Sequence, residues 1–273
     1  MSKYIDTHSH IYESKFDADR TEVLQRMDEN DVSTIVVGVS LETSKKCVEL
    51  AAKEERVVGA TIGVHPTDTS EGFDPDVYGR LLNEFKTSDV LNLVVGVGEC
   101  GFDYFRTPRD GVYVRQREVF EAQVAFAVEH DLPLMLHVRP SDGGTDAHDD
   151  ALEVLQLYQK KHGDAVRGNV HFFTSSKEVA RAYLDLGFTI AFPGVITFAP
   201  ELADVVRDVP LDMTLSETDA PYASPVPHRG ERNEPVFIID TIKAIADIRG
   251  EDVEHVAAQL QKNALMVFPK CTS

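Results

Sequence analysis

The chain has 273 residues, of which 42% are hydrophobic and 17 are glycine, and these values exclude a peptide-sized scaffold and favour one sizeable globular core. No apolar run approaches the roughly 18 residues that a membrane span requires, so we expect a protein that does not cross a membrane. The 46 acidic residues outnumber the 27 basic ones and give a formal net charge of -19, which argues against broad electrostatic adhesion to nucleic acid or anionic lipid.

Short apolar runs rich in β-branched residues recur along the chain, with helical patterns between them. Apolar residues spaced by three and four, as in Val124, Ala127 and Val128, are typical of these helices. The predicted strands cover residues 3–8, 33–39, 57–64, 91–98, 132–138, 169–173, 188–192 and 213–217. Eight strands in strict alternation with helices predict an α/β fold, a (β/α)8 TIM barrel, with an open doubly wound sheet as the alternative.

Two segments could separate domains, but neither behaves as a linker. Residues 139–147 are rich in Gly and Asp, and residues 221–235 are rich in Pro. Each follows a predicted strand, which is typical of the loops that carry function in barrels. We therefore expect a single domain over residues 1–273.

Two further features bear on the compartment. The opening MSKYIDTHSH has no basic start followed by an apolar stretch, so a secretion signal is not expected and the cytoplasm is the expected location. Cys47, Cys100 and Cys271 are too few and too scattered for a disulfide framework or a thiolate zinc site, so we expect free thiols.

Polar side chains with metal-binding chemistry gather at the carboxyl ends of the predicted strands. In a barrel these ends share one mouth, where enzymes of this fold place their chemistry. Five of the ten histidines of the chain occur there. The candidate residues are His8, His10, His65, Glu99, His137, His171 and Asp219.

His8 and His10 are two residues apart, and this spacing turns both side chains of a strand to the same face. One cation could then bind both imidazoles. Four histidines and two carboxylates exceed the three or four protein ligands of a single catalytic ion, so two ions bridged by a carboxylate fit better. Glu99 is the natural bridge.

Structural alternatives exist for each of these residues. Any one histidine could simply donate a hydrogen bond to a carbonyl. Glu99 could be a surface acid, although it follows an apolar run where an unpaired buried carboxylate would be costly. Asp219 could cap a helix, because a short Ser-Glu-Thr-Asp stretch before a proline is typical of caps. Cys100 should pack on the opposite side of its strand from Glu99.

The motifs of this chain resemble those of the TatD family of metal-dependent deoxyribonucleases, within the amidohydrolase-like barrel superfamily. The resemblance covers nearly the whole chain. It rests on ordered blocks that include DTHSH at 6–10, GVHP at 63–66, GECGFDY at 98–104, HVR at 137–139, HFF at 171–173, ETDAPY at 217–222 and NEP at 233–235.

The resemblance implies a ligand set and a cofactor. His8, His10, Glu99 and Asp219 look like ligands of one ion, and Glu99, His137 and His171 look like ligands of the second. The family favours Mg or Mn for activity. The mixture of imidazole and carboxylate ligands is also compatible with Zn.

Phosphodiester cleavage would give several of these residues roles. Asp219 would accept a proton from the attacking water, and Glu99 would hold the two ions together. His65 would contact a phosphate or protonate the leaving oxygen, unless it only forms the turn before Pro66. Arg139 would clamp the substrate, and Tyr222 would stack on a base, unless its ring only packs.

Further arginines follow the fourth and eighth predicted strands. They are Arg106, Arg109, Arg115, Arg117, Arg229 and Arg232. They could add positive charge near an anionic substrate, or they could be solvated loop residues.

These expectations give three hypotheses for the function. The first is a divalent-metal-dependent deoxyribonuclease that acts on single-stranded DNA or strand ends, with an exonuclease and a monomer expected. The second keeps the two metal ions but attacks a small molecule, as an amidohydrolase-type esterase, lactonase or amidase. The third is a non-catalytic scaffold, which an intact set of six ligands disfavours. Fold alone does not discriminate between them.

Overall fold

The computed structural model describes residues 2–84, 93–269 and 271. Residues 91 and 92, which begin the fourth predicted strand, lie outside this described part. So do small portions of the predicted domain, residues 1, 85–90, 270, 272 and 273.

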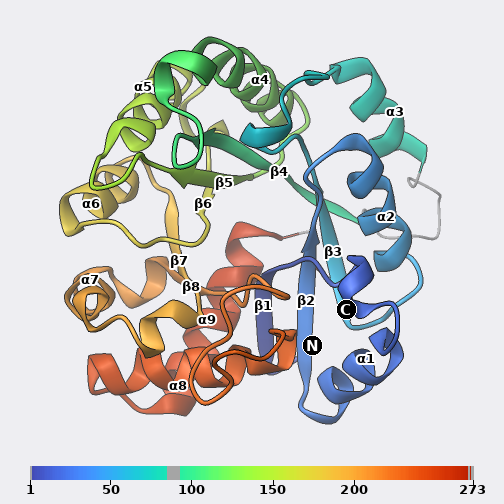
Figure 1. Ribbon diagram of the computed structural model, residues 1–273, viewed down its shortest axis with the longest axis vertical. Helices are drawn as coiled ribbons and strands as arrows, with labels where there is room; N and C mark the ends of the chain where they lie inside the picture. The colour runs from blue at the N-terminus through green and yellow to red at the C-terminus, as the bar shows by residue number, and fades with distance from the viewer. Residues whose placement is uncertain (1, 85–92, 270, 272–273) are drawn as a thin grey trace.

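Eight parallel strands form one sheet in which each strand pairs with the next along the chain, and the prediction of a TIM barrel is confirmed (Figure 1). The repeated βα unit explains this order, because each helix returns the chain to the end of the sheet where the next parallel strand begins. The strands are β1 (Tyr4–Ser9), β2 (Val32–Val37), β3 (Val57–Ile62), β4 (Val94–Asp103), β5 (Leu134–Arg139), β6 (Gly168–Val170), β7 (Thr189–Phe192) and β8 (Thr214–Ser216).

The barrel closes between β1 and the segment that follows β8. Ser9 and Ala220 form an isolated parallel bridge, and the amide of Asp219 donates to the carbonyl of His8 at 2.9 Å. The hydroxyl of Thr7 donates to the carbonyl of Ser216 at 3.0 Å. The last strand is short, so these contacts beyond its end join β1 to the segment that follows β8 at the mouth.

Helices surround the strands as an outer layer (Figure 1). In α4, for example, Val119, Phe120 and Val124 are buried on one face, and this apolar stripe packs against the sheet. The helices are α1 (Arg20–Glu29), α2 (Leu41–Ala51), α3 (Pro75–Glu84), α4 (Arg109–Glu129), α5 (Asp146–His162), α6 (Lys177–Asp185), α7 (Ala203–Asp208), α8 (Ile238–Arg249) and α9 (Val253–Val267).

The end of the barrel where the strands begin is filled by apolar side chains. Ile35 of β2, Val95 of β4 and Met135 of β5 form a buried cluster with Val267 of α9 and the following Phe268. The carboxyl-terminal helix thus closes the end where the strands begin. The opposite end, where the strands finish, is left for polar side chains.

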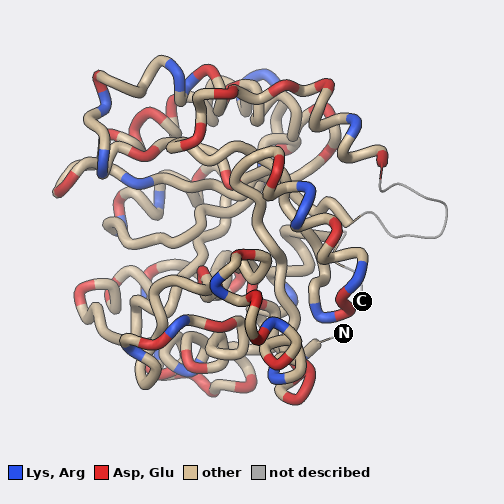
Figure 2. The backbone as a smooth tube through the Cα atoms, turned by 45° about the vertical axis from the view of Figure 1, so that its right-hand side comes forward, with Lys and Arg blue, Asp and Glu red and all other residues tan. Residues whose placement is uncertain are grey.

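The surface carries the excess of acid. Asp and Glu positions are spread along the chain in both halves of the molecule, and Lys and Arg are interspersed among them (Figure 2). Among the described residues, no helix combines the length and the apolar character that a membrane crossing needs.

Candidate metal centre

All seven residues singled out at the strand ends lie together at the mouth of the barrel. His8 belongs to β1 and His10 follows it, while His65, His171 and Asp219 come after β3, β6 and β8. The site opens into a cavity of about 580 Å³, which six of the seven residues line. His8 is fully buried and does not line the cavity, so it lies behind the lining residues, in the interior of the barrel.

The first group of ligand atoms is formed by the two histidines of β1 and two carboxylates. The Nε2 atoms of His8 and His10 are 3.1 Å apart, and they lie 3.7 and 3.4 Å from Oδ1 of Asp219. Oε2 of Glu99 is 3.6 and 3.7 Å from the same two nitrogens. Nδ1 of His10 is 3.0 Å from the carbonyl of Val37, to which it can donate, so its Nε2 is left with a lone pair toward the carboxylates.

The second group surrounds the other oxygen of Glu99. Oε1 is 2.7 Å from Nδ1 of His137 and 3.3 Å from Nε2 of His171. Nε2 of His65 lies 3.7 Å from the same oxygen. Glu99 therefore presents one oxygen to each group, which is the placement that a bridging carboxylate needs.

The position of Glu99 in its strand differs from the prediction. The fourth strand was predicted to end at residue 98, before Glu99, but β4 continues to Asp103 and all ten of its residues are buried. His137 lies within β5, inside the predicted run 132–138. The pairing of β4 with β5 shifts register between Val97 and Cys100, and such irregularities next to active sites redirect a side chain. Cys100 is buried in the core cluster between sheet and helices, as expected.

The charges of the site favour a bound cation. Burial alone would raise the pKa of Glu99, but the imidazoles of His65 and His171 outweigh it and hold that pKa well below the usual value. Burial would likewise lower the pKa of His171, but Glu217 and Glu99 outweigh it and raise the pKa well above the usual value. The buried carboxylate of Glu99 thus remains ionised, and positive charge is favoured on His171.

The residues present fit divalent metal ions. Glu99, Asp103, Glu217 and Asp219 form ion pairs with histidines, and no Lys or Arg of the described chain is within ion-pair distance of any of them. Buried carboxylates without a cationic partner are costly unless a proton or a metal neutralises them. Imidazole nitrogens and carboxylate oxygens in groups of three within 4.8 Å suit Zn or Mn.

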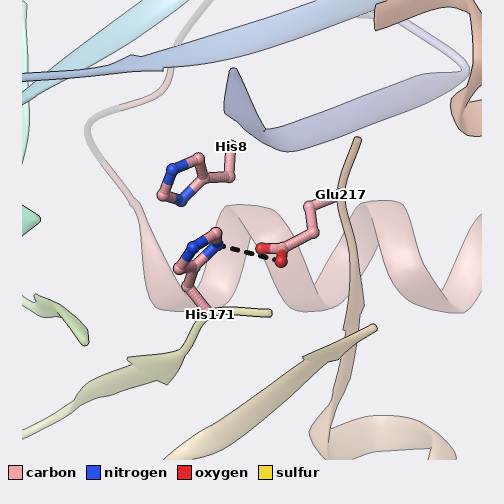
Figure 3. A group of neighbouring side chains, drawn as sticks. All are labelled: His8, His171 and Glu217. Carbon is pink, nitrogen blue, oxygen red and sulfur yellow. Dashed lines mark ion pairs between the residues drawn. The ribbon is translucent and has the colours of Figure 1, made fainter. Parts of the chain in front are cut away.

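Two carboxylates that the sequence analysis did not assign complete the site. Oε1 of Glu217 is 2.9 Å from Nδ1 of His171 (Figure 3) and accepts the amide of Phe172 at 2.6 Å. Oδ2 of Asp103 is 3.0 Å from Nε2 of His137. Carboxylates behind histidine ligands orient the ring and raise its basicity. The motifs GECGFDY and ETDAPY contain both residues, but no signal in the sequence shows which histidine each one meets.

His8 and His171 come from opposite parts of the sequence and stack on each other. Their ring centroids are 3.6 Å apart with an interplanar angle of 18°, and Figure 3 shows the two rings next to each other, with Glu217 beside His171. Nδ1 of His8, Nδ1 of His171 and Oε2 of Glu217 accept or donate no hydrogen bond among the described residues, so His171 and Glu217 are joined by an ion-pair contact. This layer of buried rings fixes the depth at which the ligand nitrogens face the cavity.

Asp6 is a third residue whose role the sequence analysis missed. It is fully buried, and it accepts the amide and the hydroxyl of Thr218 at 2.8 and 2.7 Å. It also accepts the amide of His8 at 3.3 Å and the hydroxyl of Thr34 at 3.2 Å. One carboxylate therefore ties the strand that carries two histidines to the segment that carries Asp219.

Asp219 is not a helix cap, so that alternative is wrong. The next helix, α8, begins only at Ile238. The backbone of Asp219 has a φ of 56° and that of Phe172 a φ of 50°, a left-handed conformation that non-glycine residues seldom adopt. Both amides are held by hydrogen bonds, to His8 and to Glu217 respectively. Strained backbone that the surroundings hold in place is typical of functional sites.

His65 is held as a neutral donor at the edge of the site. Its Nδ1 accepts the amide of Thr67 at 3.2 Å, so the hydrogen-bond network assigns the proton to Nε2, the nitrogen that faces Glu99. Burial and the neighbouring His137 lower the pKa of His65 to about 3. At neutral pH this residue can therefore donate a hydrogen bond but carries no charge.

Arg139 and Tyr222 both line the cavity. The guanidinium of Arg139 lies over the ring of Phe105, 3.7 Å from its centroid. The hydroxyl of Tyr222 donates to Glu13 at 2.8 Å, and Nζ of Lys15 lies 4.0 Å from the centroid of its ring. Both side chains are exposed, so their rings and charges are available to a ligand.

Most of the other arginines near the mouth are committed to carboxylates. Arg109 pairs with Asp150 at 2.7 Å, and Arg232 pairs with Asp19 at 2.6 Å. Arg115 and Arg117 pair with glutamates of their own helix. These four are therefore neither solvated loop residues nor free positive charge: three belong to α4 (Arg109–Glu129) and all four are paired with carboxylates. Arg106 lines the cavity.

Comparison with known proteins identifies relatives over nearly the full length. The sequence model of the TatD related DNase family matches residues 5–269. The uncharacterized metal-dependent hydrolase YcfH of Escherichia coli K12 is 35% identical over 271 residues, with 97% of this chain and 95% of YcfH covered. The 3'-5' ssDNA/RNA exonuclease TatD of Pantoea ananatis is 32% identical over 263 residues, with 93% and 95% covered.

Solved structures agree with this relationship. The TatD homologue YJJV from Escherichia coli K12 superimposes with a TM-score of 0.85 at 27% identity, covering 98% of each chain. A TatD-family hydrolase from Entamoeba histolytica has a TM-score of 0.80 at 22% identity and covers 98% of each chain. At that lower identity the likeness shows the fold alone.

Proposed function

The chain belongs to the family of TatD related DNases and is a metal-dependent hydrolase, and on this premise we propose that it cleaves phosphodiester bonds of DNA. The preferred substrate is a single strand or a strand end, from which nucleotides are removed one after another. The observation that carries the proposal is Glu99, whose two oxygens face separate groups of ligand atoms. The name of the Pantoea relative, an exonuclease on single strands, supports the choice of substrate.

Six residues would hold two divalent ions. His8, His10, Glu99 and Asp219 belong to the first ion, and Glu99, His137 and His171 to the second. Mg or Mn would serve for activity, and Zn suits the imidazole ligands as well. Bound together, the two ions would supply an activated water and neutralise charge on the phosphoryl oxygens.

The protein residues move and orient the protons. The carboxylate of Asp219 is partly exposed to the cavity and accepts the proton of the attacking water. His65 carries its proton on Nε2, as its bond from Thr67 requires, and donates it as a hydrogen bond to a phosphate oxygen or to the leaving oxygen. Because its pKa is about 3, His65 acts as a neutral donor rather than as an imidazolium.

Arg139 and Tyr222 contact the substrate next to the reacting bond. Arg139 is held over Phe105 and forms no ion pair with a carboxylate of the described residues, so its N–H groups are free to bind a phosphate. Tyr222 is 43% exposed and offers a ring on which a base can stack.

The experiment is hydrolysis by the metal-reconstituted protein. Oligonucleotides labelled at either end, single-stranded and duplex, are incubated with Mg, Mn or Zn and with a chelator, in parallel with a simple phosphodiester and a lactone. We expect a ladder of successively shorter DNA strands that the chelator abolishes. Turnover of the lactone without cleavage of DNA would overturn the proposal in favour of a small-molecule esterase, lactonase or amidase.

A further inference from the structure

Exposed aromatic rings on the described residues occur only on loops at the mouth. Among the large hydrophobic side chains that are exposed, the aromatic ones are Phe105, Phe198 and Tyr222, which follow β4, β7 and β8. Each ring lies beneath a cation. The distances from the cation to the ring centroid are 3.7 Å for Arg139 over Phe105, 3.6 Å for Arg229 over Phe198, and 4.0 Å for Lys15 over Tyr222.

The arginines of these pairs are exceptional in an acidic protein. Of the 15 arginines in the sequence, 11 form an ion pair with a carboxylate. The four that pair with no carboxylate of the described chain are Arg80, Arg106, Arg139 and Arg229. Three of these four lie at the mouth, Arg139 as the last residue of β5 and Arg106 and Arg229 on loops, so positive charge that is not neutralised gathers where an anionic substrate must approach.

Phe198 and Arg229 stand outside the cavity that holds the metal ligands. They are carried by two different loops, and these loops are joined firmly. The amide of Val226 donates to the hydroxyl of Thr197 at 2.8 Å, and a Cβ added to Gly194 would lie 3.0 Å from Pro225. Phe198 and Arg229, which together form an aromatic and cationic platform, are therefore held in place before any ligand binds, and this reduces the entropy lost on binding.

We propose that Phe198 and Arg229 form a nucleotide subsite beside the metal pocket, which holds an unpaired nucleotide of the strand away from the scissile bond. The inference rests on the proposed function. A guanidinium held over a ring keeps its N–H donors in one plane, where they can bind a phosphate, while its outer face or the exposed part of the ring stacks on a base.

The chemistry of this subsite selects unpaired nucleic acid. A base in a duplex is stacked and paired inside the helix, so its face is not available to the platform. A strand that enters the pocket and continues over the β7 and β8 loops gains contacts that a dinucleotide cannot reach. The subsite thus makes the enzyme prefer long single strands.

The experiment compares two substrates with the same metal-loaded protein. The ratio of kcat/KM for a single strand of about 20 nucleotides to kcat/KM for a dinucleotide is measured in wild type, Phe198→Leu and Arg229→Gln. We expect each variant to lower the ratio about tenfold, chiefly through a higher KM for the long strand. Phe198→Tyr, which keeps the ring, should restore the ratio. Arg80→Gln, which removes an unpaired arginine on α3, should leave it unchanged.

The outcomes separate the subsite from the proposed function. If wild type cleaves DNA and both variants keep the wild-type ratio, the subsite is wrong and the nuclease activity stands. If Arg80→Gln lowers the ratio as much as Arg229→Gln, general charge and not the platform is responsible, and the subsite is again wrong. If metal-loaded wild type cleaves no nucleic acid, the proposed function fails and the subsite falls with it.

Discussion

Replacing Glu217 by glutamine tests whether the carboxylate behind His171 tunes the metal centre. The side chain is fully buried, and a single oxygen serves both His171 at 2.9 Å and the amide of Phe172 at 2.6 Å. Glutamine has nearly the same volume and keeps an oxygen that can accept the amide of Phe172 and lie beside the ring of His171. The substitution therefore removes the negative charge while it leaves the packing and the orientation of the ring in place.

The expected loss follows from the negative charge that the carboxylate places beside His171. Replacing a carboxylate behind a ligating histidine typically weakens metal affinity by about 10- to 100-fold. Because glutamine keeps an oxygen beside the ring, we expect the lower end, about tenfold or about 1.4 kcal/mol. The weakened ion should be the one that His171 would bind, with the other changed less.

The assay is a calorimetric titration of the chelator-stripped protein with Mn and Zn, beside a urea unfolding curve. Asp150→Asn is the matched control, because Asp150 is also buried and pairs with Arg109 at 2.7 Å but lies outside the cavity lining. The control should lose stability and keep its metal affinity. An unchanged affinity in Glu217→Gln, or an equal loss of affinity in Asp150→Asn, would show that the carboxylate behind His171 does not tune the metal centre.

Three further predictions concern activity, acid stability and the backbone beneath the site. Asp219→Asn should lower kcat at least about 100-fold with an unchanged circular dichroism spectrum, and a folded variant that retains most activity would contradict its role as base. Burial lowers the pKa of His148, whose Nδ1 is 3.2 Å from the hydroxyl of Tyr183, from 6.5 to about 4. Below pH 6.5 the unfolded chain therefore binds more protons than the folded protein, so the stability that neutral His148 contributes above pH 6.5 is lost as the pH falls. The free energy of unfolding measured in urea should be about 2 kcal/mol lower at pH 5 than at pH 7 because of this group. In His148→Gln the free energy of unfolding should depend less steeply on pH. Gly101 has a φ of 141° and an added Cβ would lie 2.1 Å from the carbonyl of His137, so Gly101→Ala should lower the free energy of unfolding by more than about 4 kcal/mol, against about 1 kcal/mol for Gly143→Ala, where no atom lies within 4 Å.

The strands and their order could be predicted because the signals for them are local. A run of β-branched residues such as 33–39 marks a buried strand wherever it occurs, and alternation with helices leaves few topologies. Each of the eight predicted runs overlaps an observed strand. The ends were less certain. The fourth strand reaches Asp103, well past the predicted end at residue 98, because its pairing with β5 extends it, and pairing depends on a partner elsewhere in the chain.

The candidate ligands could be found for a similar reason. Placing His8, Glu99, His137 and His171 near strand ends needs only the strand pattern and the rule that parallel strands finish at one edge. The supporting carboxylates could not be found in this way. Glu217 meets Phe172 across 45 residues, and Asp6 meets Thr218 across 212; an acidic side chain looks the same in the sequence whether it faces solvent or a histidine.

By itself, then, the sequence determined the alternation of strands and helices, the single barrel and the set of imidazoles and carboxylates that meet at its mouth. The tertiary structure decided which oxygen of Glu99 faces which histidines, which carboxylates stand behind them, and which arginines remain free of acidic partners. The difference comes from how far apart along the chain the interacting residues are. Strand and helix patterns come from contacts between near neighbours in the chain, whereas partners in a buried polar site are chosen by barrel closure, which brings residues 6 and 218 within hydrogen-bonding distance.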